Sequence, residues 1–259
     1  MSLPAGARDR RRGLGAAPAS AAPTLVPCLL LRKGRVCLPG PDGPVAVRSK
    51  AGPPLDPFDV IDRLSPQYDR LYLVDLDGIE RGSPQLDYIQ ELSRDMDLWV
   101  DAGVPSADAA IDILVAGAQR AVLSSSHLRS PVELRRAWKL STDWVFETEI
   151  VDGAVRNSGP VWESDGVVAL AQSARTVGIS DIVVSPREKE PDWGLVRAVA
   201  ADGPTWVDGS FTASQAPRLA EVGAAGGIFH LDLLLADLLS SPPTSPPPDE
   251  SVSPRDDED

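Results

Sequence analysis

Short runs of β-branched and apolar residues alternate with longer runs of mixed polarity along most of this 259-residue chain. The short runs predict strands at residues 25–31, 70–75, 98–101, 121–124, 144–149, 181–185, 205–208 and 227–230. The longer runs place apolar residues at helical spacing and predict helices at residues 56–64, 107–117, 131–140, 167–178, 193–201 and 213–223. Three of these helices end at a glycine, which suits a left-handed helix cap (Gly117, Gly178 and Gly223).

The alternation of strands and helices predicts a parallel sheet, because parallel strands need crossover connections. Eight such units within about 215 residues have the content of a closed barrel, whereas a doubly wound open sheet commonly has fewer strands at this length. The predicted fold is therefore an α/β protein with a (β/α)8 TIM barrel.

An internal repeat refines this prediction. The tripeptide Trp-Val-Asp occurs at residues 99–101 and again at 206–208, an offset of 107 residues. Each copy precedes a helix and a Gly-Ala pair, at 117–118 and 223–224, an offset of 106 residues. A repeat of this length is too long for a solenoid unit. It predicts a barrel built from two half-barrels.

The two ends of the chain differ from the middle in composition. Residues 1–23 are rich in Ala, Gly, Pro and Arg and lack the apolar run of a secretory signal, while residues 240–259 are rich in Pro, Ser and acidic residues. We expect disordered extensions at 1–23 and 240–259, with the barrel occupying 24–239. The absence of any apolar run of 18 residues argues against a membrane partner.

Charge and cysteine content narrow the classes of function further. The net charge of −13 argues against a nucleic-acid partner, because phosphate backbones require clustered Lys and Arg. The 42% hydrophobic and 24% charged composition is that of a folded protein. Two cysteines cannot form a disulfide scaffold and are compatible with a reducing cytosol, so we expect a cytoplasmic protein.

Acidic residues gather where the predicted strands end, which is the end at which such barrels carry their chemistry (Asp75, Asp77, Asp101, Glu147, Glu149 and Asp208). Strand alternation predicts that Glu147 and Glu149 share one face, and likewise Asp75 and Asp77. Because neighbouring carboxylates disfavour each other's ionisation, we expect at least one of them to hold its proton near neutral pH.

Two of the same strand ends are candidates for binding an anion. Gly103 follows the third predicted strand, and Ser124, Ser125 and Ser126 follow the fourth, just before a helix. A weaker candidate in the second half contains Gly209 and Ser210, with His230 at the eighth strand. Arg32 and Arg187 are cations expected at the same end. The alternative is that these segments are ordinary tight turns.

Several segments resemble the histidine-biosynthesis barrel family, which comprises the phosphoribosylformimino-aminoimidazole-carboxamide-ribotide isomerase and its cyclase sister. They include VPCLLLRKGRV from residue 26, RLYLVDLDGIERGSPQLDYIQEL from residue 70, WVDAGV from residue 99 and GAQRAVLSSS from residue 117. The resemblance extends to about residue 238. It implies a barrel of duplicated halves that holds a substrate phosphate at each end.

The resemblance also assigns residues. The family's general base, an aspartate at the end of the first strand, corresponds to Leu30 here, and a leucine cannot transfer a proton. The family's acid at the fifth strand corresponds to Glu149, and its hydroxyl at the sixth strand to Ser185. Its glycine-rich phosphate loops correspond to residues 101–103 and 208–210, where Asp101 and Asp208 would repel a phosphate dianion.

We therefore expect a divergent isomerase or lyase that acts on a small phosphorylated metabolite, in histidine or one-carbon cofactor biosynthesis, and needs no cofactor. Its catalytic residues would be Glu149, Asp77 or Glu147, and Ser185, and its phosphate would contact Gly103, Ser124, Ser125, Gly209, Ser210 and Arg32. A barrel that has lost catalysis and binds a metabolite or protein is the alternative. A metal-assisted enzyme using Asp75, Asp101 and Asp208 is a third hypothesis, although no compact metal motif supports it. The oligomeric state stays open.

Overall fold

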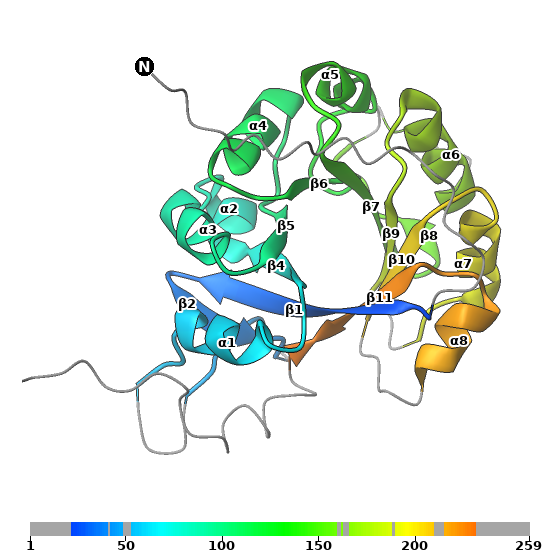
Figure 1. Cartoon of the computed structure of the whole chain (residues 1–259). Coiled ribbons are helices and arrows are strands. Elements are labelled where there is room, and N and C mark those ends of the chain that lie inside the picture. Colours follow the sequence, from blue (N-terminus) through cyan, green and yellow to red (C-terminus); the bar gives the residue numbers. More distant parts are fainter. Residues whose placement is uncertain are drawn as a thin grey trace, which may run out of the picture.

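The computed structural model describes residues 22–40, 42–48, 53–159, 162, 166–187, 190–209 and 215–231. Within this part of the chain, parallel strands form a closed ring (Figure 1). In chain order the ring strands are β1 (Thr24–Arg32), β4 (Arg70–Asp75), β5 (Asp97–Asp101), β6 (Arg120–Ser124), β7 (Trp144–Val151), β9 (Ile182–Pro186), β10 (Thr205–Gly209) and β11 (Gly226–His230). Pairing of β11 with β1 closes the ring, so the predicted TIM barrel is confirmed.

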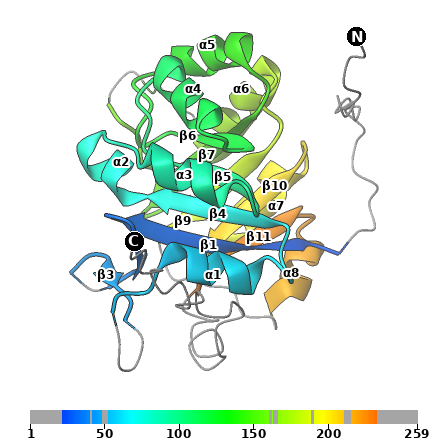
Figure 2. The same cartoon turned by 60° about the vertical axis from the view of Figure 1, so that its left-hand side comes forward.

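Helices surround this ring on its outer side (Figures 1 and 2). They are α1 (Pro57–Leu64), α2 (Leu76–Arg81), α3 (Leu86–Leu92), α4 (Ala107–Val115), α5 (Val132–Leu140), α6 (Val167–Val177), α7 (Trp193–Ala200) and α8 (Ala216–Glu221). The glycine at the end of α6 shows why the predicted caps are needed. Gly178 has φ of +117°, and a Cβ there would lie 2.5 Å from the Trp138 ring.

Three short strands lie outside the eight ring strands: β2 (Arg35–Leu38), β3 (Val45–Ala46) and β8 (Ala154–Val155). β2 forms an antiparallel hairpin with β1, and β8 forms one with β7. Both hairpins extend the ring at its carboxyl end. The extensions expected at 1–23 and 240–259 lie outside the described residues except for residues 22 and 23, as do residues 232–239 of the expected barrel.

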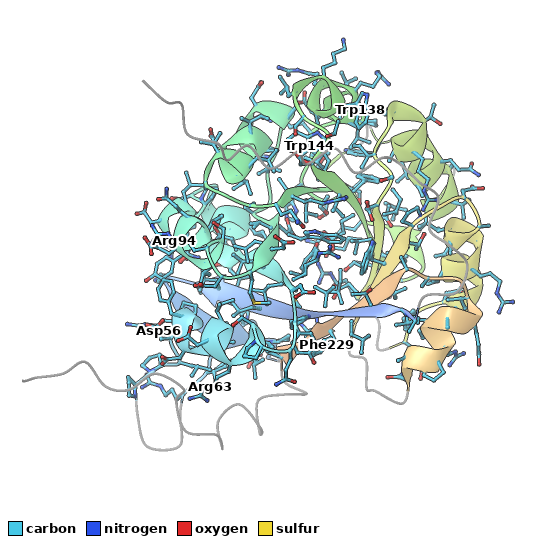
Figure 3. All side chains as sticks on the ribbon, viewed as in Figure 1. Asp56, Arg63, Arg94, Trp138, Trp144 and Phe229 are labelled. Atoms are coloured by element: carbon cyan, nitrogen blue, oxygen red, sulfur yellow. The ribbon has the colours of Figure 1, made fainter. Side chains whose placement is uncertain are left out.

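Strand alternation divides the buried side chains into two layers. One set lies between the strands and the helices, and the other fills the inside of the ring, where Figure 3 shows side chains crowded together. The inner set includes Cys28, Tyr72, Val145, Val183 and Ile228. The barrel is therefore a packed core and not a pore.

The two copies of the Trp-Val-Asp repeat meet inside the barrel. β5 and β10 lie four strands apart in the ring, and the rings of Trp99 and Trp206 contact each other edge to face with centroids 4.9 Å apart. The guanidinium of Arg70 lies 4.5 Å from the centroid of Trp99, and Asp181 accepts a hydrogen bond from the indole N–H of Trp206. We call Arg70, Trp99, Asp181 and Trp206 the barrel floor.

Asp75 connects β4 to α2. Its buried carboxylate accepts hydrogen bonds of 2.6–3.2 Å from the backbone N–H groups of Asp77, Gly78 and Gln85 and from the Gln85 side chain. Because this cap starts α2 at Leu76, Asp77 lies in a helix. The expectation that Asp75 and Asp77 share a strand face is therefore wrong.

Replacement of this cap tests its structural importance. Asp75→Ala should lower the free energy of unfolding by about 2–4 kcal/mol, because several buried donors lose their acceptor. Urea denaturation measures the loss. Asp56→Ala is the matched control, since Asp56 caps α1 through one backbone N–H and should cost about 1 kcal/mol. Equal losses in the two variants would contradict the central role of Asp75.

Candidate active site

A cavity of about 550 Å³ opens at the carboxyl ends of the barrel strands. Barrels of this fold carry their active sites at this end, and the volume is typical of small-molecule sites. Its lining contains many groups that carry charge or form hydrogen bonds: Tyr72, Asp101, His127, Glu147, Glu149, Arg156, Arg187, Asp208 and His230. We call it the mouth cavity.

A second, more open hollow of about 670 Å³ lies between α5 and α6, outside the barrel. Arg135 and Lys139 are among its described lining residues, and no carboxylate is. Acid–base chemistry is therefore better supported at the mouth cavity, where acids and bases face one another.

The geometry of β7 places two glutamates in the mouth cavity. Glu147 and Glu149 follow Val145 on the inward face, whereas Phe146 packs in the outer core. Both glutamates are at most 3% exposed. The prediction that they share a face is confirmed.

Glu149 is surrounded by cations. Its Oε1 accepts a hydrogen bond from Nε of Arg187 and lies 3.4 Å from Nη1 of Arg156. Burial alone would raise the pKa of Glu149, but Arg187, the Ser126 hydroxyl and Arg156 outweigh burial and lower it. Glu149 is therefore held in its ionised form.

Glu147 is in the opposite situation. Burial, together with the charge of Asp101, raises its pKa well above the ordinary glutamate value, and Arg187 only partly offsets this. Burial also raises the pKa of Asp101, with His127 acting against it. Both shifts agree in direction with the expectation that neighbouring carboxylates in this cluster disfavour each other's ionisation, and the stronger shift is that of Glu147.

Ser185 and Asp208 form a buried pair on neighbouring strands. The Ser185 hydroxyl donates to Oδ2 of Asp208 at 2.9 Å, and Nε2 of His230 lies 3.7 Å from Oδ1 of the same carboxylate. Among the described residues, Oδ1 of Asp208 and the hydroxyl of Tyr72 have no hydrogen-bond partner. Ser185 therefore orients Asp208 and leaves one of its oxygens available.

The loops expected to bind phosphate use many of their donors internally. The N–H of Gly103 donates to Oδ1 of Asp101 at 3.0 Å. Ser124 and Ser126 share a hydrogen bond between their hydroxyls, and the Ser125 hydroxyl donates to the carbonyl of Arg156.

In the second half of the barrel, Gly209 lines the mouth cavity, and Ser210 lies outside the described residues. Phosphate binding by these loops stays a prediction.

Two expected site residues make structural contacts outside the cavity lining. Oδ2 of Asp77 accepts the backbone N–H of Lys33 at 2.5 Å, and Oδ1 lies 3.3 Å from Arg81. Arg32 is paired with Glu80 and also donates to the carbonyl of Pro44. These contacts join α2 to the β1–β2 hairpin and do not support a catalytic Asp77 or a phosphate-binding Arg32.

The structure adds Arg156 to the site, a residue that the sequence did not reveal. Arg156 follows β8, and the hairpin turn at Asp152 and Gly153, where both φ angles are positive, brings it back towards Glu149. The Asp-Gly dipeptide is the signal that could have revealed this hairpin. Leu30 lines the cavity from β1.

Within the described residues, no cluster of three or more His, Cys, Asp or Glu side chains is arranged to hold a metal ion. The metal-assisted hypothesis therefore gains no support from the described residues. None of the helices in the described ranges combines the length and apolar character needed to cross a membrane.

Comparison with known proteins identifies relatives. A family model described as "Histidine biosynthesis protein" matches residues 24–190. The chain is similar to proteins named 1-(5-phosphoribosyl)-5-((5-phosphoribosylamino)methylideneamino) imidazole-4-carboxamide isomerase. That of Parasynechococcus marenigrum (strain WH8102) is 30% identical over 187 residues, which cover 68% of this chain and 66% of the relative, just under two thirds of its length. That of Roseiflexus sp. (strain RS-1) is 29% identical over 182 residues, which cover 65% and 77%.

The opposite environments of the two glutamates predict opposite pH dependence. Above about pH 4.5 the folded protein keeps the Glu147 proton while the unfolded chain loses it, so stability falls as pH rises, by up to about 1.4 kcal/mol per pH unit. Glu147→Gln should reduce this fall to the part that Asp101, whose pKa is also raised, contributes. Urea denaturation between pH 5 and 8 measures it.

Glu149→Gln is the matched comparison on the same strand. Because the folded-state pKa of Glu149 is lowered, its stabilisation is present above about pH 4.5 and is lost as pH falls through the folded-state pKa. The variant should be less stable by about 1–3 kcal/mol at neutral pH, since two arginines lose their carboxylate. The same pH profile in both variants would contradict the two assignments.

Proposed function

Because the chain belongs to the histidine biosynthesis protein family, we propose that it is a divergent isomerase of that family, or a related lyase, that uses acid–base catalysis on a small phosphorylated metabolite. The catalytic unit would be the barrel at 24–239, with 1–23 and 240–259 as extensions. The observation that carries the proposal is the pair of buried glutamates on β7 whose pKa values are shifted in opposite directions.

Each glutamate suits a different proton transfer. Glu149, ionised beside Arg187 and Arg156, would accept a proton from the substrate. Glu147, which keeps its proton, would donate one to a substrate oxygen or nitrogen. Residues two apart on a strand are separated by about 6.6 Å, which leaves room for a reacting group near both carboxyls. Ser185 would act by orienting Asp208.

The outer rim of the mouth cavity is the best-supported position for a phosphate. The side chains of Arg156 and Arg187 are 61% and 49% exposed, so both can reach a dianion that stays partly in water. His127 also lines the cavity. The names of the relatives contain phosphoribosyl groups, which supports a phosphorylated substrate here.

One observation favours the alternative, a barrel that binds a metabolite without converting it. Leu30 supplies no proton acceptor at the end of β1, so the reaction depends on the two acids of β7. In that case the metabolite would bind at the mouth cavity but would leave unchanged.

Growth of a histidine-auxotrophic bacterium that lacks the isomerase tests the proposal directly. Expression of the wild-type chain should restore growth on medium without histidine. Glu149→Gln should abolish this growth, because loss of a proton-transfer group lowers turnover by about 10²–10⁴-fold. Glu91→Gln, on the exposed face of α3, is the control and should grow like the wild type.

The outcomes separate the two candidate functions. Growth with Glu149→Gln equal to the wild type would contradict the assigned role of Glu149. Failure of the wild-type chain to restore growth, combined with binding of inorganic phosphate at the mouth cavity, would favour the non-catalytic alternative.

Binding of inorganic phosphate tests the rim position. Phosphate should raise the melting temperature of the wild type in a saturable way, and Arg156→Gln should weaken its apparent affinity by about 5–10-fold through loss of a charge-assisted hydrogen bond. Arg63→Gln, on α1, removes the same charge elsewhere and should leave the affinity unchanged. Equal affinities in the wild type and Arg156→Gln would place phosphate elsewhere.

A further inference from the structure

We propose that the inner end of the mouth cavity binds a positively charged, N–H-donating group of the substrate, such as an ammonium or amidinium, between Asp101, Asp208 and Tyr72. This inference rests on the proposed function, because it names a chemical group of the metabolite handled at that site. Binding of the cationic group can be measured without any turnover of a substrate.

The first argument is the distribution of charge. Asp101, Glu147 and Asp208 project from β5, β7 and β10 into one space and are all at most 7% exposed. Their proximity is reflected in the Tyr72 hydroxyl, whose pKa is raised by burial and then by these three carboxyls. The inner end of the cavity therefore has a negative potential even when Glu147 is neutral.

The second argument is that the two arginines near these acids are engaged by Glu149. The other described basic neighbours are histidines: Nε2 of His230 lies 3.7 Å from Oδ1 of Asp208, and His127 lowers the pKa of Asp101. Nε of Arg187 donates to Glu149, and Nη1 of Arg156 lies close to the same oxygen. Arg187 is attracted by Glu147 and Asp208, but among the described residues its side-chain hydrogen bond is to Glu149. Asp101 and Asp208 are thus left without an arginine partner among the described residues.

The third argument is that polar atoms in this space lack partners. Oδ1 of Asp208 and the hydroxyl of Tyr72 are buried in the cavity wall, and no described residue forms a hydrogen bond with either. Buried oxygens of this kind are costly unless a donor reaches them. A carboxylate oxygen can only accept, so its partner must supply N–H or O–H groups.

The fourth argument excludes an anion at the inner end. At the end of β5 the N–H of Gly103 already donates to Oδ1 of Asp101 and is not available to an anion. On β10 the carboxylate of Asp208 is held by Ser185. Asp101 and Asp208, the aspartates of the two Trp-Val-Asp copies, therefore lie at equivalent strand ends. A phosphate placed beside these carboxylates would be repelled.

The nature of the cation follows from the donor set. The described acids are not arranged as ligands of a metal ion. An ammonium or amidinium presents several N–H donors around one positive charge, which matches separated carboxylates and a phenol oxygen. The substrate would then carry its phosphate at the rim and its cationic group at the inner end.

Three small probes of nearly equal shape test this inference: acetamidinium, acetamide and acetate, at constant ionic strength. Acetamidinium should raise the melting temperature of the full-length protein by a few degrees and saturate in the millimolar range. Acetamide and acetate should give less than one fifth of this shift. The measurement needs no reaction, so its result is independent of the growth test. Acetamidinium can fail to bind although the auxotroph grows, and it can bind although the auxotroph does not grow.

Two isosteric variants localise the probe. Asp101→Asn and Asp208→Asn should each weaken acetamidinium binding by at least 5-fold, and both keep a side-chain oxygen that can accept the existing hydrogen bond. Asp112→Asn, on the exposed face of α4, removes the same charge and should bind acetamidinium like the wild type.

Three results would overturn the proposal. The first is a melting-temperature shift by acetate equal to that by acetamidinium. The second is no saturable shift by acetamidinium up to 100 mM, a concentration about twenty times the expected dissociation constant and enough for near saturation. The third is unchanged acetamidinium binding in both aspartate variants. Circular dichroism of each variant shows whether it is folded, and the two single variants give independent answers if one of them is not.

Discussion

Closure of the strand ring through β1 and β11 is the constraint from which the remaining organisation follows. In a closed parallel sheet every second residue of each strand must face the same small interior, whatever its chemistry. Apolar residues such as Val145 and Val183 fill the middle of that interior. Further along the same strands, alternation leaves no choice but to bring Glu147 and Ser185 inwards as well.

The acids brought together in this way would destabilise the fold if all were ionised and unpaired. The protein solves the problem differently at each residue. Glu149 is neutralised by two arginines, the pKa of Glu147 is raised so that its protonated form is favoured, and Asp208 accepts from Ser185. Asp101 turns back to the N–H of Gly103. Acceptor oxygens therefore remain at the inner end of the mouth cavity, while the arginines lie at its rim. This separation of negative and positive charge would orient a bound ligand.

Much of the fold could be predicted from the sequence because strand and helix periodicity are local properties. The eight ring strands and the shared face of Glu147 and Glu149 depend only on the pattern within each strand. Asp77 and Arg32 show the limit of this reasoning. Their roles depend on hydrogen bonds to residues more than forty positions away, Lys33 and Glu80 respectively, which no periodicity encodes. Arg156 was missed for a similar reason, since a two-residue strand is too short to produce a pattern.

The barrel floor has a consequence for how ligands move. Trp99 and Trp206, held between Arg70 and Asp181, fill the amino end of the interior, so in the described part of the chain the mouth cavity is closed on that side. A ligand that enters such a blind cup must present its leading group first and withdraw it last. A bound ligand therefore has to leave before another molecule can occupy the same inner position. The residence time of a ligand in the mouth cavity would then depend most on the group that binds at the inner end.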